Sequence, residues 1–174
     1  QNAEEHRVEV DFSRLEDLSY VLGVIDGDGF HNKDGSLGLE TVSEKFADKF
    51  FNYLNSIGLN PGRGKRRDKE QIWASSESFI SWIDSLSFED KFRWLKEEGD
   101  PWKYIEGAYD SDGDFSNPGP RICSYDDREK EFLKKVLGYL GVAPSIHTNN
   151  VYVPTSKREK FFANVDPVYR KRRP

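Results

Sequence analysis

The chain has 174 residues, enough for one large domain or two fused small ones, and 36% of them are hydrophobic, as in a globular protein. Its single cysteine, Cys123, excludes an internal disulfide framework and fits a reducing, intracellular compartment, and with only three histidines a zinc site is disfavoured. No stretch approaches the roughly 18 apolar residues of a membrane helix, so no membrane association is expected. The net charge of −5 is unfavourable for nucleic-acid binding, which nevertheless depends on where the charges lie.

The first predicted element is a helix that begins at about Arg14. Ser13 is its expected N-cap, and Glu16, three residues on, would complete a capping box. Gly27 and Gly29 are expected to end the helix.

The elements predicted after this helix complete an α+β unit. In order they are an extended segment over 30–41 with a turn at 33–35, a helix capped by Ser43 and ended by 60–62, strands over 63–67 and 70–74 that turn at Asp68-Lys69, a helix capped by Ser75 or Ser76, and a helix over 88–98.

The second half of the chain repeats this order. Its expected elements are a helix ending at Ser111, an extended segment over 115–125, a helix over 127–140, a hairpin over 145–153 and a helix over 156–165. Gly99-Asp100-Pro101 marks the boundary, so we expect two halves, 13–99 and 100–174, that form one compact pseudo-dimer.

One short acidic pattern occurs in both halves. Residues 20–29 read Tyr-Val-Leu-Gly-Val-Ile-Asp-Gly-Asp-Gly, and residues 104–113 read Tyr-Ile-Glu-Gly-Ala-Tyr-Asp-Ser-Asp-Gly. Asp112 lies 84 positions after Asp28, and Pro144 lies 83 positions after Pro61, so the spacing persists across most of each half. The repeat predicts two pseudo-symmetric halves whose acids meet at one site.

Small residues recur at helical spacing in both motifs, at Gly23 and Gly27 and again at Gly107 and Ser111. They could simply relieve crowding in a core helix. However, glycine costs about 1 kcal/mol relative to alanine in a helix interior. Its use at matching positions favours a close crossing of the two motif helices.

If the helices cross in parallel, Asp28 and Asp112 emerge side by side at their C-terminal ends. Like charges then adjoin at the negative pole of each helix. A divalent cation removes this conflict, and paired carboxylates, waters and carbonyls suit magnesium. Shared metals of this kind cleave phosphodiesters.

A calcium-binding loop is an alternative for the second motif, because Asp110, Asp112 and Asp114 occupy positions 1, 3 and 5 of such a loop. Position 6 is Phe115 instead of glycine, and position 12 is Arg121 instead of glutamate. These two residues argue against calcium.

The segments Val21–Gly29 and Ile105–Gly113 resemble the LAGLIDADG signature of homing endonucleases, in the single-chain form with two motifs. The second copy departs from it at Glu106, Ala108, Tyr109 and Ser111. The resemblance covers nearly the whole chain. It implies tandem αββαββα units in which two antiparallel saddle-shaped sheets form a DNA-binding groove and the motif helices form the central interface.

The resemblance also implies an activity and its residues. Asp28 and Asp112 would be catalytic and bind Mg²⁺, or another divalent cation such as Mn²⁺, assisted by the carbonyls of Gly27 and Ser111. Asp26 and Asp110 would have structural roles. The chain would be a monomeric site-specific endonuclease that cleaves a long asymmetric DNA target by metal-dependent hydrolysis. Its gene would lie in an intron or intein, in a prokaryote or an organelle.

One feature departs from that family. Its members often carry Lys or Gln where the second strand of each half ends, but residues 40–42 and 124–126 contain no lysine. Lys91 could reach the site from a later helix. The departure favours the alternative of a non-cleaving intron RNA maturase or DNA-binding module of the same fold, whereas the presence of both Asp28 and Asp112 favours the enzyme.

The densest cationic cluster lies on and beside the first predicted hairpin. A charge run of this kind is often only a solvated turn, but this hairpin belongs to the expected DNA-binding face, and arginines suit guanine edges. The second hairpin is polar and nearly uncharged, so an asymmetric target is expected. The expected DNA-binding residues are Asn32, Lys33, Arg63, Lys65, Arg66, Arg67, Lys69, Gln71, Asn117, Arg121, His147, Asn149, Asn150 and Tyr152.

Overall fold

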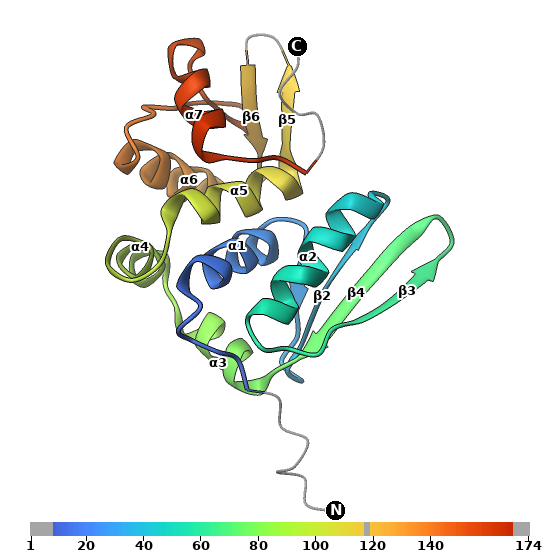
Figure 1. The fold of residues 1–174 in the computed structure, drawn as a ribbon. Helices are drawn as coiled ribbons and strands as arrows, with labels where there is room; N and C mark the ends of the chain where they lie inside the picture. Colours follow the sequence, from blue (N-terminus) through green and yellow to red (C-terminus); the bar gives the residue numbers. More distant parts are fainter. Residues whose placement is uncertain (1–8, 117–118, 169–174) are drawn as a thin grey trace, which may run out of the picture.

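Both halves follow the predicted αββαββα order, in which a helix separates two pairs of strands and another helix follows the second pair (Figure 1). The first half carries one further helix at its end. The computed structural model describes residues 9–116 and 119–168. The elements of the first half are α1 (Leu15–Asp26), β1 (Phe30–His31), β2 (Ser36–Thr41), α2 (Glu44–Ser56), β3 (Gly62–Arg66), β4 (Lys69–Ser75), α3 (Glu77–Ser85) and α4 (Phe88–Glu97). Those of the second half are α5 (Pro101–Asp112), β5 (Gly113–Ser116), β6 (Gly119–Cys123), α6 (Asp127–Tyr139), β7 (Ser145–His147), β8 (Asn150–Tyr152), the 3-10 helix η2 (Thr155–Lys157) and α7 (Arg158–Asn164).

Two antiparallel four-stranded sheets have the same strand order, β1-β2-β4-β3 and β5-β6-β8-β7. Figure 1 shows α2 lying along the first sheet and α1 and α5 between the two sheets. Leu37 and Leu39 of β2 and Ile72 of β4 are buried on the helix side of the first sheet. The intervening residues point to an open face, as the period of two in a strand requires. The predicted α+β fold class is confirmed.

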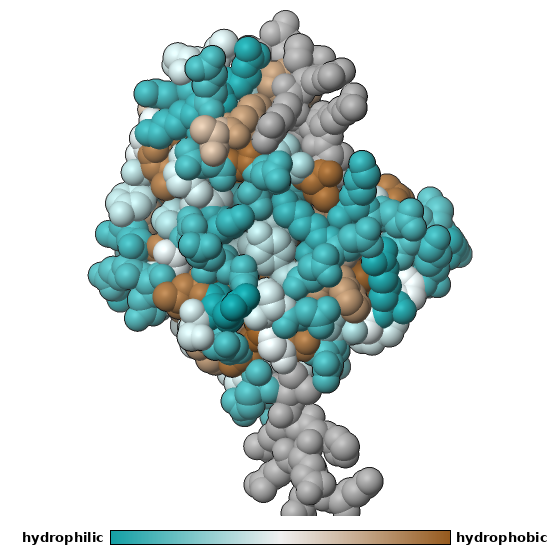
Figure 2. Space-filling model, viewed as in Figure 1, coloured by the Kyte–Doolittle hydropathy of each residue, from teal (hydrophilic) through white to brown (hydrophobic). Residues whose placement is uncertain are grey.

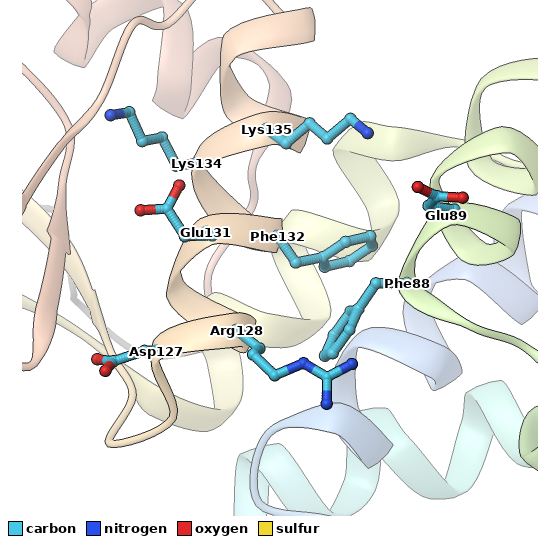
Figure 3. Close-up of a pocket in the computed structure, with 8 residues that line it drawn as sticks. All are labelled: Phe88, Glu89, Asp127, Arg128, Glu131, Phe132, Lys134 and Lys135. Carbon is cyan, nitrogen blue, oxygen red and sulfur yellow. The ribbon is translucent and has the colours of Figure 1, made fainter.

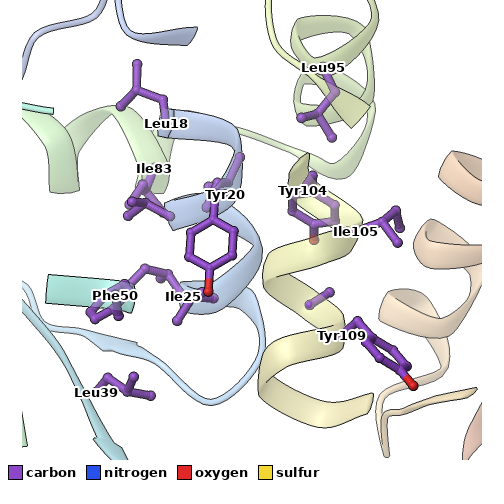
Figure 4. Close-up of a cluster of buried hydrophobic side chains, with 14 of the residues drawn as sticks. Leu18, Tyr20, Ile25, Leu39, Phe50, Ile83, Leu95, Tyr104, Ile105 and Tyr109 are labelled. Carbon is purple, nitrogen blue, oxygen red and sulfur yellow. The ribbon is translucent and has the colours of Figure 1, made fainter. Parts of the chain in front are cut away.

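The motif helices α1 and α5 cross at their glycines. A methyl group on Gly23 would lie 2.2 Å from the carbonyl oxygen of Tyr104, and one on Gly107 would lie 2.3 Å from the carbonyl oxygen of Tyr20. The two contacts are related by the internal repeat. Figure 4 shows Tyr20 on α1 and Tyr104 on α5 at this interface. The predicted close crossing is confirmed.

Side-chain caps define most helix starts. Ser43 caps α2 and Ser76 caps α3, as predicted, each by accepting a hydrogen bond from a backbone N–H three residues on. The predicted cap of the first helix is wrong: the N-cap is Arg14 and makes no side-chain bond. The hydroxyl and amide of Ser13 instead bond to Asp11 at 2.6 and 3.0 Å, a local alternative that removes Ser13 from the helix end.

The first hairpin turns one residue earlier than predicted. Arg66 pairs with Lys69, so the loop consists of Arg67 and Asp68, and Arg67 adopts a φ of 59°. A two-residue hairpin loop requires this left-handed backbone, for which Gly, Asn or Asp is the usual sequence signal. The arginine at this position therefore gives no indication of the turn.

The surface in Figure 2 is largely hydrophilic, with hydrophobic residues scattered between polar ones. Among the residues that the structure describes, no helix combines the length and the apolar character that crossing a bilayer requires.

Candidate functional site

The ends of the two motifs lie together. A methyl group on Gly27 would lie 2.5 Å from Cβ of Ser111 and 2.9 Å from Oδ2 of Asp112. The Asp112 carboxylate therefore lies against the residue that precedes Asp28. Asp28 is exposed, and Asp112 is partly exposed at the end of α5. Parallel motif helices thus bring both acids to one end of the central interface.

These groups form a donor set of oxygen atoms. Within residues 9–116 and 119–168, no cluster of three or more His, Cys, Asp or Glu side chains could hold a metal ion. Mg²⁺ keeps several waters and takes one or two carboxylates, which is the kind of donor that Asp28 and Asp112 offer. The carbonyls of Gly27 and Ser111 remain predicted ligands. The donor chemistry at the motif ends therefore suits a hydrated hard cation.

The first acid of the N-terminal motif is held across the interface. Asp26 accepts hydrogen bonds from the Tyr104 hydroxyl at 2.6 Å and from Nζ of Lys91 at 2.7 Å. Burial, and then the Asp26 charge, raise the pKa of Tyr104 well above its ordinary value. The hydroxyl therefore stays protonated and acts as the hydrogen-bond donor to Asp26. Lys91 does come from the later helix α4, but its ammonium bonds Asp26. The structural role expected for Asp26 agrees with these contacts.

The first acid of the second motif has matching partners. Asp110, which is fully buried, accepts from the Tyr20 hydroxyl at 2.7 Å, from Nζ of Lys49 at 2.7 Å and from the backbone N–H of Val168 at 2.9 Å. Burial, and then Asp110, raise the pKa of Tyr20 well above its ordinary value. Each half thus supplies a tyrosine to the acid of the other.

Glu106, where the second motif departs from the signature, belongs to the same network. Its side chain is only 2% exposed and lies 3.2 Å from Nζ of Lys49 and 3.5 Å from Nζ of Lys103. It also accepts a 2.8 Å hydrogen bond from the backbone N–H of Asp166. The unusual glutamate is therefore neutralised by two cations and ties the segment after α7 to α5.

The predicted cations of the first hairpin divide between the two faces of the sheet. Residues that pair directly across antiparallel strands point to the same face. Arg66 pairs with Lys69, on the open face that also carries Gln71, and the Gln71 amide donates a 2.5 Å hydrogen bond to Glu40. Arg67 is exposed in the turn.

Arg63 and Lys65 point to the helix side of the same sheet. Arg63 forms ion pairs with Asp48 of α2 and with Glu70, and Nζ of Lys65 lies 3.4 Å from Glu70. Glu70 is 5% exposed, so these cations neutralise a buried carboxylate. The geometry directs both away from the open face.

The open face of the second sheet carries four of the predicted residues. Arg121 bonds to Asp114 at 3.0 Å and to the Tyr152 hydroxyl at 3.2 Å, and Asp114 is the main cause that raises the pKa of Arg121 above its ordinary value. His147 pairs with Asn150 on the same face.

The remaining predicted residues lie in turns. Asn32 and Lys33 are exposed between β1 and β2, and Asn149 lies between β7 and β8. Asn117 lies outside the described residues.

Two aromatic side chains on the first open face were not among the predicted residues. Trp73 and Phe30 are 47% and 42% exposed. The sequence signal for Trp73 is the alternation along β4. Ile72 and Ala74 are buried, so their neighbours Gln71, Trp73 and Ser75 lie on the solvent side.

A hollow between α4 and α6 contains none of the predicted residues. Figure 3 shows Phe88 of α4 facing Phe132 of α6, with ring centroids 5.2 Å apart, and Arg128 beside Phe88. Its lining residues are Phe88, Glu89, Asp127, Arg128, Glu131, Phe132, Lys134 and Lys135.

Similar sequences include two curated proteins of Methanocaldococcus jannaschii. The uncharacterised protein MJ0398 is 31% identical over 148 residues, which cover 79% of this chain and 54% of that protein. The uncharacterised protein MJ0314 is 28% identical over 114 residues, covering 60% and 43%. The chain thus spans about half the length of these curated relatives. No protein-family model matches it.

Similar solved structures include the homing endonuclease I-DmoI in complex with DNA and Ca. It has 17% identity and a TM-score of 0.61, covering 86% of this chain and 88% of that one. The N-terminal LAGLIDADG domain of WhiA has 17% identity and a TM-score of 0.66, covering 89% and 83%. Full-length WhiA of Thermatoga maritima has 18% identity and a TM-score of 0.67, covering 92% and 58%. The chain therefore has the LAGLIDADG fold, with both motifs in one chain.

Proposed function

We propose that this chain is a site-specific, double-stranded DNA endonuclease that hydrolyses phosphodiester bonds at Asp28 and Asp112. The observation that carries this proposal is the contact between the Asp112 carboxylate and Gly27, which joins the two motif ends. A neighbour of the same fold, I-DmoI, is named as a homing endonuclease and has been solved with DNA and Ca and with DNA and Mn.

In this proposal each half, 13–99 and 100–174, supplies one acid and one open sheet. Asp28 and Asp112 hold a divalent cation, Mg²⁺ or Mn²⁺, with the carbonyls of Gly27 and Ser111 beside them. When bound, such a cation supplies a Lewis acid that activates water and stabilises the leaving oxygen. The open sheets bind the DNA and orient the scissile phosphate over the acids.

The inner network fixes the position of the acids. Asp26 and Asp110 lie two residues before Asp28 and Asp112, and each is tied to the opposite half by a tyrosine and to a buried or half-buried lysine. Because both tyrosine bonds and the bond from Lys49 to Asp110 cross the interface, they hold the two motif ends at one separation. Such fixed geometry favours a shared site.

A second candidate is a DNA-binding module of the same fold that does not cut. The observation that favours it is the chemistry at the end of β2, which carries Glu40 and Thr41 and no lysine. Lys91 and Lys49 bond to Asp26 and Asp110 and so neutralise the first acids of the two motifs. The fold is also shared by a protein named as an endonuclease and by one that is not.

A cleavage assay on a library of randomised duplexes distinguishes the two candidates. With Mg²⁺ or Mn²⁺ the wild type should release defined ends from one sequence family, and chelation should stop the reaction. Asp28→Asn and Asp112→Asn should each abolish cleavage and keep DNA affinity within a few-fold, whereas Glu97→Gln, an exposed acid on α4, should cut normally. Full activity in either asparagine variant would contradict the shared site. Selective binding without any cleavage would support the second candidate.

A further inference from the structure

One row of residues crosses the open face of the first sheet from edge to edge. Phe30 pairs with Gly38, Gly38 pairs with Trp73, and Trp73 pairs with Gly62. The row therefore alternates aromatic ring and glycine across all four strands. Phe30 and Trp73 are 42% and 47% exposed.

The glycines allow both rings to lie down on the sheet. A methyl group on Gly62 would lie 2.4 Å from Nε1 of Trp73, and one on Gly64 would lie 3.3 Å from the same ring. A methyl group on Gly38 would lie 2.7 Å from the Phe30 ring. The indole thus covers two glycines of β3, and the Phe30 ring covers the glycine of β2. The result is an apolar strip that lies low on the face.

The equivalent row in the second sheet has the opposite chemistry. In the same strand order it consists of Asp114, Arg121, Tyr152 and Ser145. Arg121 is held between Asp114 at 3.0 Å and the Tyr152 hydroxyl at 3.2 Å. One half therefore presents an apolar strip where the other presents an oriented guanidinium.

We propose that the strip formed by Phe30 and Trp73 contacts thymine methyl groups in the major groove and specifies thymine in one half-site. This inference rests on the proposed binding of duplex DNA. Thymine alone offers an apolar group at the major-groove edge. A G·C pair placed there would leave its donors and acceptors facing the rings without partners, at a cost in free energy.

The neighbouring residues fit the same ligand. Beyond the strip, Glu40 and Gln71 form a polar pair, and Arg66 and Lys69 lie at the tip of the hairpin. Cations at the tip suit phosphates, and the polar pair suits base edges. Exposed rings can also stack on unpaired bases. However, the chain has two similar sheets, and on the first one a polar pair lies between the strip and the cations at the hairpin tip. This arrangement favours a duplex.

The experiment selects bound sequences from a randomised duplex pool in EDTA, so that cleavage does not interfere. The wild type, Trp73→Ala, Trp73→Phe and Tyr152→Ala are compared, the last as the matched control from the equivalent row. Each thymine of the wild-type consensus is then replaced by deoxyuridine, which lacks only the methyl group. Circular dichroism and thermal melting verify that each variant is folded.

We expect a thymine preference in one half-site. Deoxyuridine at that position should weaken wild-type binding about fourfold, the effect of removing one methyl group from an apolar contact. Trp73→Ala should lose both the preference and the sensitivity to deoxyuridine, and Trp73→Phe should keep them. Tyr152→Ala should alter the other half-site only.

Three results would overturn the inference. They are selective binding that is indifferent to deoxyuridine, an unchanged thymine preference in Trp73→Ala, and tighter binding of single strands that depends on Trp73. Failure of the proposed function looks different. If no sequence is enriched, both proposals fall, whereas a thymine preference without cleavage in Mg²⁺ contradicts only the nuclease and supports the strip.

Discussion

Tyr20 of the first half donates a 2.7 Å hydrogen bond to Asp110 of the second, and the reciprocal bond from Tyr104 to Asp26 measures 2.6 Å. Both tyrosines are buried. Each bond crosses the interface between α1 and α5 two residues before a proposed metal ligand. The pair therefore ties the two halves together at the point where their acids must meet.

Replacing either tyrosine with phenylalanine should destabilise the protein. Tyr20→Phe and Tyr104→Phe each remove a donor from a buried or half-buried carboxylate, which costs about 1–3 kcal/mol. Denaturant unfolding measures the loss. Tyr125→Phe is the control, because Tyr125 is 83% exposed. If Tyr20→Phe unfolds at the wild-type midpoint, the bond to Asp110 contributes nothing to the interface.

The close crossing predicts that one substitution has opposite effects at two helical glycines. Gly107→Ala places a methyl group 2.3 Å from the Tyr20 carbonyl oxygen, and because backbone atoms cannot rotate away, the helices must separate. The cost should be at least the roughly 1–3 kcal/mol that is typical of overpacking. Gly138→Ala meets nothing within 4 Å and should gain up to about 1 kcal/mol from helix propensity. Thermal melting compares the two. Equal melting temperatures would contradict the crossing.

Sequence alone could predict the crossing because it depends on local pattern. Gly23 and Gly107 are marked by their repeat and by the absence of side chains, and Ser43 and Ser76 by their position before amphipathic helices. The partners of buried charges could not be predicted in this way. Lys49 lies 61 positions from Asp110, and nothing local in either segment indicates their contact.

The sequence could not predict which cations of the first hairpin lie on the open face and which lie on the helix side. Arg63, Lys65 and Arg66 form one charge run, but a strand turns successive side chains to opposite faces. Which face each residue joins depends on the register with β4, where buried Ile72 pairs with Arg63. A shift of one residue would exchange the faces, so the run alone cannot tell a DNA contact from an ion pair with Asp48.

Stability should fall with rising pH through the titration of Glu129. Burial, followed by the charges of Asp26 and Asp126, raises its pKa from 4.5 to about 7. The folded state then binds the proton more tightly than the unfolded state, so the free energy of unfolding decreases between about pH 4.5 and 7 and stays lower above it. Below that window both states are protonated and the effect vanishes.

Glu129→Gln should remove this contribution. The variant should be more stable than the wild type at pH 8, and the difference should shrink as the pH falls toward 4. Urea unfolding at several pH values measures it. Glu131→Gln, an exposed acid on the same helix, is the control and should follow the wild type. A difference that is independent of pH would show that the glutamine acts through packing instead.

Two pairs of cations on the same hairpin have different environments. Arg66 lies on the open face and Arg67 in the exposed turn, whereas Arg63 and Lys65 form ion pairs with Asp48 and Glu70 on the helix side. If the open face binds DNA, replacing Arg66 and Arg67 with alanine should weaken binding by a few kcal/mol, roughly, and relax base preference in one half-site. Each lost phosphate contact should also lower the slope of log affinity against log salt by about 0.9. Replacing Arg63 and Lys65 should leave that slope unchanged and reduce stability, because Glu70 is buried and loses both cations. Affinity against salt and urea unfolding, measured for both double variants on one selected duplex, separate the two effects. A lower salt slope in the Arg63 and Lys65 variant would show that the DNA lies on the helix side of this sheet.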